Sequence, residues 1–300
     1  MQAAGVTPPN PGEDDARAAP GVAGQTGVTG ELKQDRFIGA HDLTLWQGPA
    51  GRFLAWLTHR LAIRFGPNAA LVLTLMVGML IVLSLSAAAA EVYDAVTDSD
   101  GVAGFDKPLL AIAMSMRSPW LDAISTAYTD VAGTVGMPII AVGALLILAL
   151  HRRSWTPAIL IAAAGTGSLL MTIAGKDLIG RDRPPLADAV PPYEYSPSFP
   201  SGHTLNAVVI AGIVAYLLIL RQKSARARFV TVGVATLFAF TIGLSRVYLG
   251  HHWLTDVLAG WMLGTAWLVI VITAHRLYLT TRRRLPDPVV QSLDFDDRPR

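Results

Sequence analysis

Three short polar segments stand out in an otherwise apolar chain because their residue types suit chemistry on a phosphate group. They read GKDLIGRDRPP (175–185), PSGH (200–203) and SRVYLGHHWLTDV (245–257). Their cations Lys176, Arg183 and Arg246 supply one ammonium and two guanidinium groups, and a guanidinium fork can bind two phosphate oxygens at once. These side chains indicate a site for a doubly or triply charged oxyanion, with phosphate as the first candidate.

The middle segment adds backbone donors to these cations. Ser201 is placed to cap a helix that begins there, and Gly202 lets the backbone come close to a ligand. The free N–H groups at the start of a helix form a ready anion site. We therefore expect Ser201 and Gly202 to lie at the phosphate site.

The third segment contains a histidine suited to nucleophilic attack. His252 and Asp256 are four residues apart, so they share one face at the start of a helix. A carboxylate in that position can accept a hydrogen bond from one ring nitrogen, which fixes the tautomer and leaves the other nitrogen free. His251 has Thr255 at the same spacing and lacks such a partner. The spacing favours His252, although an isolated pair of this kind is more often a structural cap.

Some of these residues also have simpler explanations. A lysine at a helix end, such as Lys176, can extend its ammonium group to the membrane surface without binding a ligand. The whole set is not explained in this way, because that role requires neither two adjacent histidines nor a Ser-Gly-His turn. Asp177, Asp182 and Asp188 lack a metal-ligand spacing, and we interpret them as solvated loop charges. No metal and no other cofactor is expected.

The composition indicates which elements hold these side chains. Of the 300 residues, 52% are hydrophobic and only 15% are charged, and the mean hydropathy is +0.44. A soluble domain has about a quarter of its residues charged, so the chain is predicted to be a membrane protein. A net charge of +2 gives little support for nucleic-acid binding, and the lack of cysteine excludes disulfides, thiolate nucleophiles and Cys-ligated metals.

Six apolar runs are long enough, or nearly so, for helices that cross the hydrocarbon core, which takes about 20 residues. They lie at 67–90, 131–150, 154–175, 201–220, 229–245 and 257–274. The predicted fold class is therefore all-α, a polytopic membrane protein with six transmembrane helices.

The connections between the runs alternate in charge. Four of them are basic, and their residues include Arg52, Arg60, Arg64, Arg152, Arg153, Arg221, Lys223, Arg226, Arg228, Arg276 and Arg282–Arg284. The positive-inside rule places these four on the cytoplasmic side. Both termini are then cytoplasmic, and the three polar segments meet at the outer face of a cell membrane.

The remaining chain is divided by composition. Residues 1–50 are predicted to form a disordered tail, and 278–300 a basic and then disordered one. Residues 51–66 have apolar side chains on one i, i+4 row and arginines on the next, which favours a helix lying at the membrane surface. An N-terminal extension of the first spanning helix fits that segment equally well. The membrane domain is assigned to 67–277.

The three segments together carry a family resemblance. K-x6-RP from Lys176 to Pro184, PSGH, and SR-x5-H-x3-D from Ser245 to Asp256 resemble the three-part signature of the type 2 phosphatidic acid phosphatase superfamily. Each part is weak alone, whereas all three in order within about 67–277 are specific. The resemblance implies a six-helix membrane core with its active site at the outer face.

The resemblance also implies roles for individual residues. Lys176, Arg183, Ser201, Gly202 and Arg246 match the phosphate-binding positions of the family. His252 matches its nucleophile, which forms a phosphohistidine, and Asp256 matches the acid that orients the nucleophile. His203 matches the general acid that protonates the leaving oxygen and then activates water.

The chain is therefore expected to be a metal-independent membrane phosphatase that takes a lipid phosphate or diphosphate from the bilayer. Polyprenyl diphosphate, such as undecaprenyl diphosphate, phosphatidate and phosphatidylglycerol phosphate all fit. Two alternatives remain: a vanadate-dependent haloperoxidase-like enzyme, which shares the signature, and a non-catalytic anion-binding transporter. Phosphotransfer to an acceptor other than water is a further variant.

Overall fold

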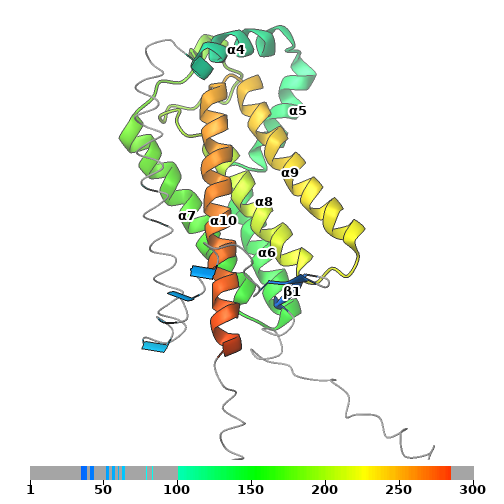
Figure 1. Ribbon diagram of the computed structural model, residues 1–300. Coiled ribbons are helices and arrows are strands. Elements are labelled where there is room, and N and C mark those ends of the chain that lie inside the picture. The colour runs from blue at the N-terminus through cyan, green and yellow to red at the C-terminus, as the bar shows by residue number, and fades with distance from the viewer. Residues whose placement is uncertain are drawn as a thin grey trace, which may run out of the picture.

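The computed structural model describes residues 101–284 and, before them, 35–38, 41–43, 52–53, 56–57, 60, 63–64, 79 and 83. Its main elements are the helices α4 (Asp106–Ser115), α5 (Pro119–Asp130), α6 (Gly136–Arg152), α7 (Thr156–Ile179), α8 (Gly202–Ile219), α9 (Ala225–Tyr248) and α10 (Leu254–Arg284). Two 3-10 turns, η2 (Gly101–Phe105) and η3 (Leu186–Asp188), and two strands, β1 (Phe37–Ile38) and β2 (His41–Asp42), complete the described part. The helices α6 to α10 run side by side (Figure 1).

Four of these helices, α7 to α10, are long and apolar enough to cross a membrane. Local signals set their ends. Pro157 stands in the first turn of α7, where its missing N–H costs nothing, and Gly180 ends the helix in the left-handed conformation at φ 61°. The side chain of Ser224 accepts a hydrogen bond from the N–H of Ala227 and caps α9. α6 is apolar as well but shorter, with 17 residues.

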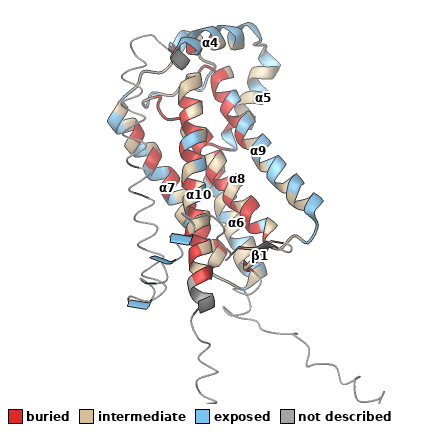
Figure 2. Ribbon diagram, viewed as in Figure 1, coloured by how far each residue is buried: buried red, intermediate tan, exposed pale blue. Residues whose placement is uncertain are grey.

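The helix α8 lies at the centre of the bundle, where it contacts α7, α9 and α10. Figure 2 shows buried residues concentrated on α8, α10 and the facing side of α7, whereas the outer faces of α6 and α9 are exposed. Small residues let the helices approach closely. A Cβ atom on Gly167 of α7 would lie 2.0 Å from the ring of Trp267 on α10. The exposed apolar faces suit a lipid environment.

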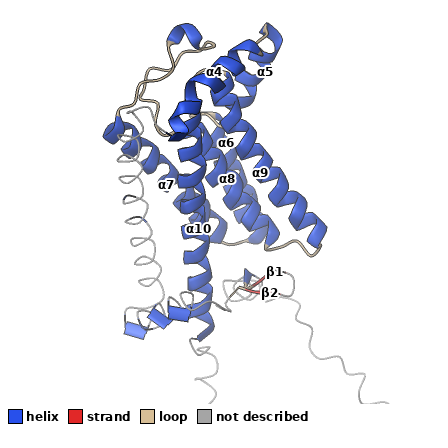
Figure 3. Cartoon of the chain, turned by 45° about the horizontal axis from the view of Figure 1, so that its top comes forward, coloured by secondary structure: helices blue, strands red, loops and turns tan. Residues whose placement is uncertain are grey.

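The helix α4 lies across one end of the bundle, and α5 descends from it beside the upper part of α9; η3 and the connection 180–201 lie at the same end (Figures 1 and 3). Arg117 fastens this layer, because its Nε and Nη2 atoms donate to the carbonyl oxygen of Tyr248 over 3.0 and 2.8 Å. The hydroxyl of Tyr248 in turn donates to Asp122 of α5 over 2.7 Å. We call this the capped end. β1 and the last turn of α10 lie at the opposite end.

The third to sixth apolar runs of the sequence correspond to α7, α8, α9 and α10, and the second run to α6. The first run and the predicted surface helix 51–66 lie outside the described residues except for isolated positions. The helices α4 and α5 were not expected, because they lie in the connection between the first and second apolar runs, for which no helix was predicted. α10 continues to Arg284, beyond the predicted end of the membrane domain, and β1 pairs with β2 inside the segment predicted to be a tail.

Candidate active site

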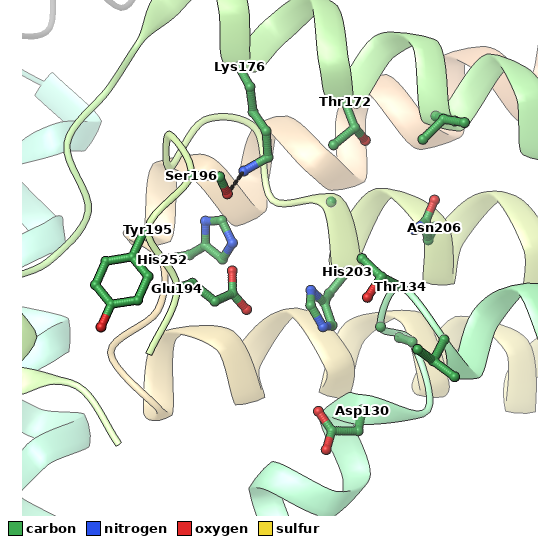
Figure 4. A pocket seen from close by; sticks show the side chains of 15 residues that line it. Asp130, Thr134, Thr172, Lys176, Glu194, Tyr195, Ser196, His203, Asn206 and His252 are labelled. Atoms are coloured by element: carbon green, nitrogen blue, oxygen red, sulfur yellow. Dashed lines mark hydrogen bonds between the residues drawn. The ribbon is translucent and has the colours of Figure 1, made fainter. Parts of the chain in front are cut away.

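The three polar segments of the sequence meet at the capped end of the bundle. Since successive helices run in opposite directions, this end gathers the last turns of α7 and α9 and the first turns of α8 and α10. A cavity of about 700 Å³ opens there. Its walls come from the α5–α6 connection, α7, residues 194–196, the start of α8 and His252 (Figure 4).

His252 is held from one side by Asp256, as the spacing predicted. The Nδ1 atom of the ring lies 3.4 Å from Oδ2 of Asp256, and the same Oδ2 accepts hydrogen bonds from Ser198 Oγ at 2.5 Å and from the N–H of Trp253 at 2.9 Å. The other ring nitrogen, Nε2, lies 3.3 Å from an Nη atom of Arg183. Burial, and then the charge of Arg246, lower the pKa of His252 well below its usual value, so the ring is neutral and one nitrogen keeps its lone pair.

His251 has a different environment. Its Nε2 donates to the carbonyl oxygen of Val190 over 2.7 Å, and its side chain is 3% exposed. It does not line the cavity, whereas His252 does. Burial is the main cause that lowers the pKa of His251 to about 4. The neighbouring histidines thus have separate surroundings, one at the cavity and one against Val190 of the connection 180–201.

The predicted cations converge on one carboxylate that the sequence did not single out. Nη2 of Arg183 lies 2.8 Å from Oε2 of Glu194, and Nη2 of Arg246 donates to Oε1 of the same residue. Lys176 lies beside them and donates to Ser196 Oγ over 2.9 Å. Burial alone would raise the pKa of Glu194, but Arg246 and Arg183 outweigh it and lower that pKa. Glu194 lines the cavity and is paired with both guanidinium groups behind it.

His203 faces the same space from the first turn of α8. Figure 4 shows the carboxyl group of Glu194 between the rings of His203 and His252. Gly133 lies close to this ring, because a Cβ atom on it would lie 3.2 Å from Nε2 of His203, a tight contact. Two histidines therefore flank the place that the carboxylate occupies.

Ser201 and Gly202 lie at the start of α8, as expected, but in different ways. Gly202 lines the cavity. Ser201 occupies the N-cap position without a capping hydrogen bond from its side chain; its Oγ instead accepts from Thr204 Oγ1 over 2.9 Å. Its N–H donates to the carbonyl oxygen of Asp256 over 3.2 Å, which ties α8 to α10. The predicted N-cap position of Ser201 is therefore confirmed, although its hydroxyl makes no capping hydrogen bond.

Four residues at the site were missed in the sequence: Asp106, Arg181, Glu194 and Ser198. Arg181 lies two residues before Arg183 and offered a signal, since a second guanidinium in a short polar segment is unusual at a membrane. Asp106 gave none, because it meets Arg181 from 75 positions away. Glu194 and Ser198 belong to a proline-rich connection whose path the sequence pattern does not specify.

Known proteins are similar to this chain over the region that contains the three polar segments. Residues 155–278 match the profile of the PAP2 superfamily. The chain is 35% identical to phosphatidylglycerophosphatase B of Bacillus subtilis over 170 residues, which cover 55% of this chain and 81% of that protein. It is 30% identical to lipid A 4'-phosphatase of Bacteroides thetaiotaomicron over 206 residues, 61% of this chain and 82% of the other.

A solved structure gives the same result. The crystal structure of a transmembrane PAP2-type phosphatidylglycerolphosphate phosphatase from Bacillus subtilis matches with a TM-score of 0.57 and 28% identity. The match covers 65% of this chain and 94% of that one. The resemblance drawn from the three motifs is confirmed, and the chain belongs to the PAP2 superfamily.

Proposed function

We propose that this protein is an integral membrane phosphatase that hydrolyses a lipid phosphate or diphosphate through a phosphohistidine on His252. The observation that carries the proposal is the position of the His252 ring. Its Nδ1 side faces the buried carboxylate of Asp256, and its Nε2 side faces Arg183 and the cavity. A neutral imidazole held in this way is a nucleophile directed at a phosphate site.

In the first step, Nε2 of His252 forms a bond to phosphorus while the bond from phosphorus to the leaving oxygen breaks. His203 donates a proton to that oxygen, and Asp256 stabilises the positive charge that develops on the attacking ring. In the second step, His203 takes a proton from water, the hydroxide attacks phosphorus, and the bond to Nε2 breaks. Lys176, Arg183 and Arg246 bind the phosphoryl oxygens and stabilise their charge in both transition states.

A lipid substrate is supported by the surroundings of the cavity. Two apolar side chains on its wall, Val135 at the start of α6 and Leu169 on α7, are 69% and 57% exposed. A hydrocarbon chain bound to the phosphate can leave the cavity over these residues into the bilayer. The relatives act on phospholipid or lipid A phosphates according to their names, and we propose phosphatidylglycerol phosphate and polyprenyl diphosphates as the first substrates to test.

The proposed topology has six spans, with both termini in the cytoplasm and the active site at the outer face of the cell membrane. It is supported by the distribution of charge along the bundle. Arg152, Arg221 and Arg276 lie at the end opposite the cavity, and they belong to the segments that the positive-inside rule retains in the cytoplasm. An anion conduit is disfavoured, because Leu205, Val209 and Ile213 of α8, which continue below the cavity, are completely buried.

The test is phosphate release by the purified protein in detergent with a chelator present. The substrates are a polyprenyl diphosphate, phosphatidate, phosphatidylglycerol phosphate and a soluble phosphomonoester. His252→Ala is the test variant and His251→Ala is its matched control. Release that persists with chelator, disappears in His252→Ala and survives in His251→Ala is the expected result. If His251→Ala is inactive and His252→Ala is active, the nucleophile is assigned to the wrong histidine. No release by folded wild-type protein rejects the proposed hydrolysis.

A further inference from the structure

Arg181 is a third arginine near the site, and it does not line the cavity. Its Nη1 atom lies 2.6 Å from Oδ1 of Asp256 and donates to Thr255 Oγ1 over the same distance of 2.6 Å. Its Nη2 atom lies 2.8 Å from Oδ2 of Asp106 on α4. The guanidinium group is therefore held between two carboxylates that come from different helices, α4 and α10.

Asp106 is fixed from a second direction. Its Oδ1 accepts a hydrogen bond from the N–H of Thr255 over 3.0 Å, and its Oδ2 accepts one from the Thr255 hydroxyl over 2.7 Å. The N–H group of Thr255 is one of those at the start of α10 that have no partner within their own helix. Asp106 thus caps α10 from α4 and at the same time anchors Arg181.

The three charged groups depend on one another because they are removed from water. The side chain of Asp256 is 0% exposed, that of Asp106 is 5% and that of Arg181 is 10%. A buried carboxylate is costly unless a counter-charge and hydrogen bonds compensate it. Burial alone would lower the pKa of Arg181, but Asp256 and Asp106 outweigh it and raise that pKa, so the compensating charge is permanent.

The two oxygens of Asp256 have separate partners. Oδ1 is bound by Arg181, whereas Oδ2 faces Ser198, the N–H of Trp253 and the Nδ1 atom of His252. With Oδ1 fixed, the carboxylate cannot rotate to present a different edge to the imidazole. Arg183, two residues further along the chain, lies at the opposite nitrogen of the same ring.

We propose that Arg181 is a positioning residue for the nucleophile, with Asp106 as its anchor. It fixes the carboxylate of Asp256 so that Oδ2 orients the His252 ring, and it does not itself contact the phosphate. This inference rests on the proposed function for the role of His252. It gives two nearby arginines different roles, since Arg183 binds phosphate and Arg181 acts only through Asp256.

The test compares Arg181→Gln and Arg181→Lys with Arg117→Gln. Arg117 is a suitable control because it also ties the capped end together, through the carbonyl of Tyr248, without touching Asp256. For Arg181→Gln we expect kcat to fall by about 10- to 100-fold, the loss that is typical when the hydrogen-bond partners that orient metal-ligating side chains are removed. The dissociation constant for inorganic phosphate should change less than about twofold, since the groups that bind its oxygens are untouched. Arg181→Lys should recover part of kcat, and Arg117→Gln should keep all of it.

Asp106→Asn provides the second measurement, because it weakens the anchor and leaves Arg181 in place. In a double-mutant cycle, Asp106→Asn should cause little further loss of kcat when it is added to Arg181→Gln. This is the result expected for two side chains that act together. Additive losses, or an equal loss of kcat in Arg117→Gln, would show that the arginine serves general stability. A weaker affinity for inorganic phosphate in Arg181→Gln would show that it binds phosphate. Either result overturns the proposal.

A readout that does not depend on turnover separates this inference from the proposed function. Imidazole ¹⁵N spectra of the histidine-labelled protein report the tautomer and hydrogen bond of His252. Arg181→Gln should alter the His252 signals, and Arg117→Gln should leave them unchanged. If the wild-type protein releases no phosphate but the spectra change as expected, the positioning role holds while the proposed reaction fails. Unchanged spectra in Arg181→Gln reject the positioning role whatever the activity.

Discussion

Replacing Glu194 by glutamine should make the protein bind inorganic phosphate more tightly. The carboxylate bridges Arg183 and Arg246, two of the groups assigned to the phosphate. The side chain of Arg246 is 1% exposed, and its buried Nε atom has no hydrogen-bond partner among the described residues. A phosphate that binds the Nη2 atoms of both arginines must displace Glu194 from them, so the carboxylate competes with the ligand.

The size of the effect follows from the two ionic contacts. A hydrogen bond between charged groups contributes about 1.5–3 kcal/mol when it is buried. Glu194 is 29% exposed, so solvent screening reduces the sum, and glutamine still accepts one hydrogen bond. Glu194 should therefore weaken phosphate binding by roughly 1–2 kcal/mol in total. Since 1.4 kcal/mol is a factor of about ten, the affinity of Glu194→Gln for phosphate should be about 5- to 30-fold higher.

The assay is titration of the detergent-solubilised protein with inorganic phosphate and with orthovanadate, followed by calorimetry. Asp182→Asn is the matched control, because it removes one negative charge from an exposed side chain of the same connection. The control should bind as the wild type does. Unchanged or weaker binding in Glu194→Gln would refute the reasoning, and it would mean that the carboxylate arranges the two arginines for the ligand.

Two further predictions concern stability. Because the pKa of His251 is about 4 in the folded protein against 6.5 in an unfolded chain, the unfolded chain binds more protons between these values, and the free energy of unfolding should decrease as the pH falls from about 6.5 to about 4. His251→Gln, which keeps a donor for the Val190 carbonyl, should flatten that decrease in thermal unfolding, and an equally steep decrease would contradict the assignment. Gly167→Ala should destabilise by about 1–3 kcal/mol because its methyl group would overlap the Trp267 ring, while Gly233→Ala, with no described atom within 4 Å, should show no such loss.

The long helices could be predicted from the sequence because hydropathy alone specifies them. α7, α8 and α9 begin and end within about four residues of their apolar runs, where Gly180, Ser224 and the polar segments mark the ends. Their alternation then implied that Lys176, His203 and His252 would share one end of the bundle, and the structure brings them together there. The helices α4 and α5 have only 10 and 12 residues, so neither a continuous apolar run nor a membrane-spanning length distinguishes them in the sequence.

The contacts that complete the site could not be predicted, because they join distant segments through side chains of ordinary type. Arg181 and Asp106 form an ion pair only because α4 folds over the start of α10. Glu194 meets Arg246 across 52 positions. The motif spacing supplied the residues that contact each other within one helix or its first turn, such as His252 and Asp256. It contained no information on how the connection 180–201 returns to the site.

The connection 180–201 is a structural part of the site, because residues near both of its ends bind to residues of the site. The N–H of Ser198 donates to the carbonyl oxygen of Arg181 over 2.8 Å, which closes the connection on itself, and the Ser198 hydroxyl is bound to Asp256. Glu194 lies inside this closed segment and is attached to the site mainly through Arg183 and Arg246. A phosphate that replaces the carboxylate therefore leaves the contacts of Arg181 and Ser198 intact. The His252 ring, which we propose as the nucleophile, can therefore remain oriented while a ligand exchanges with Glu194.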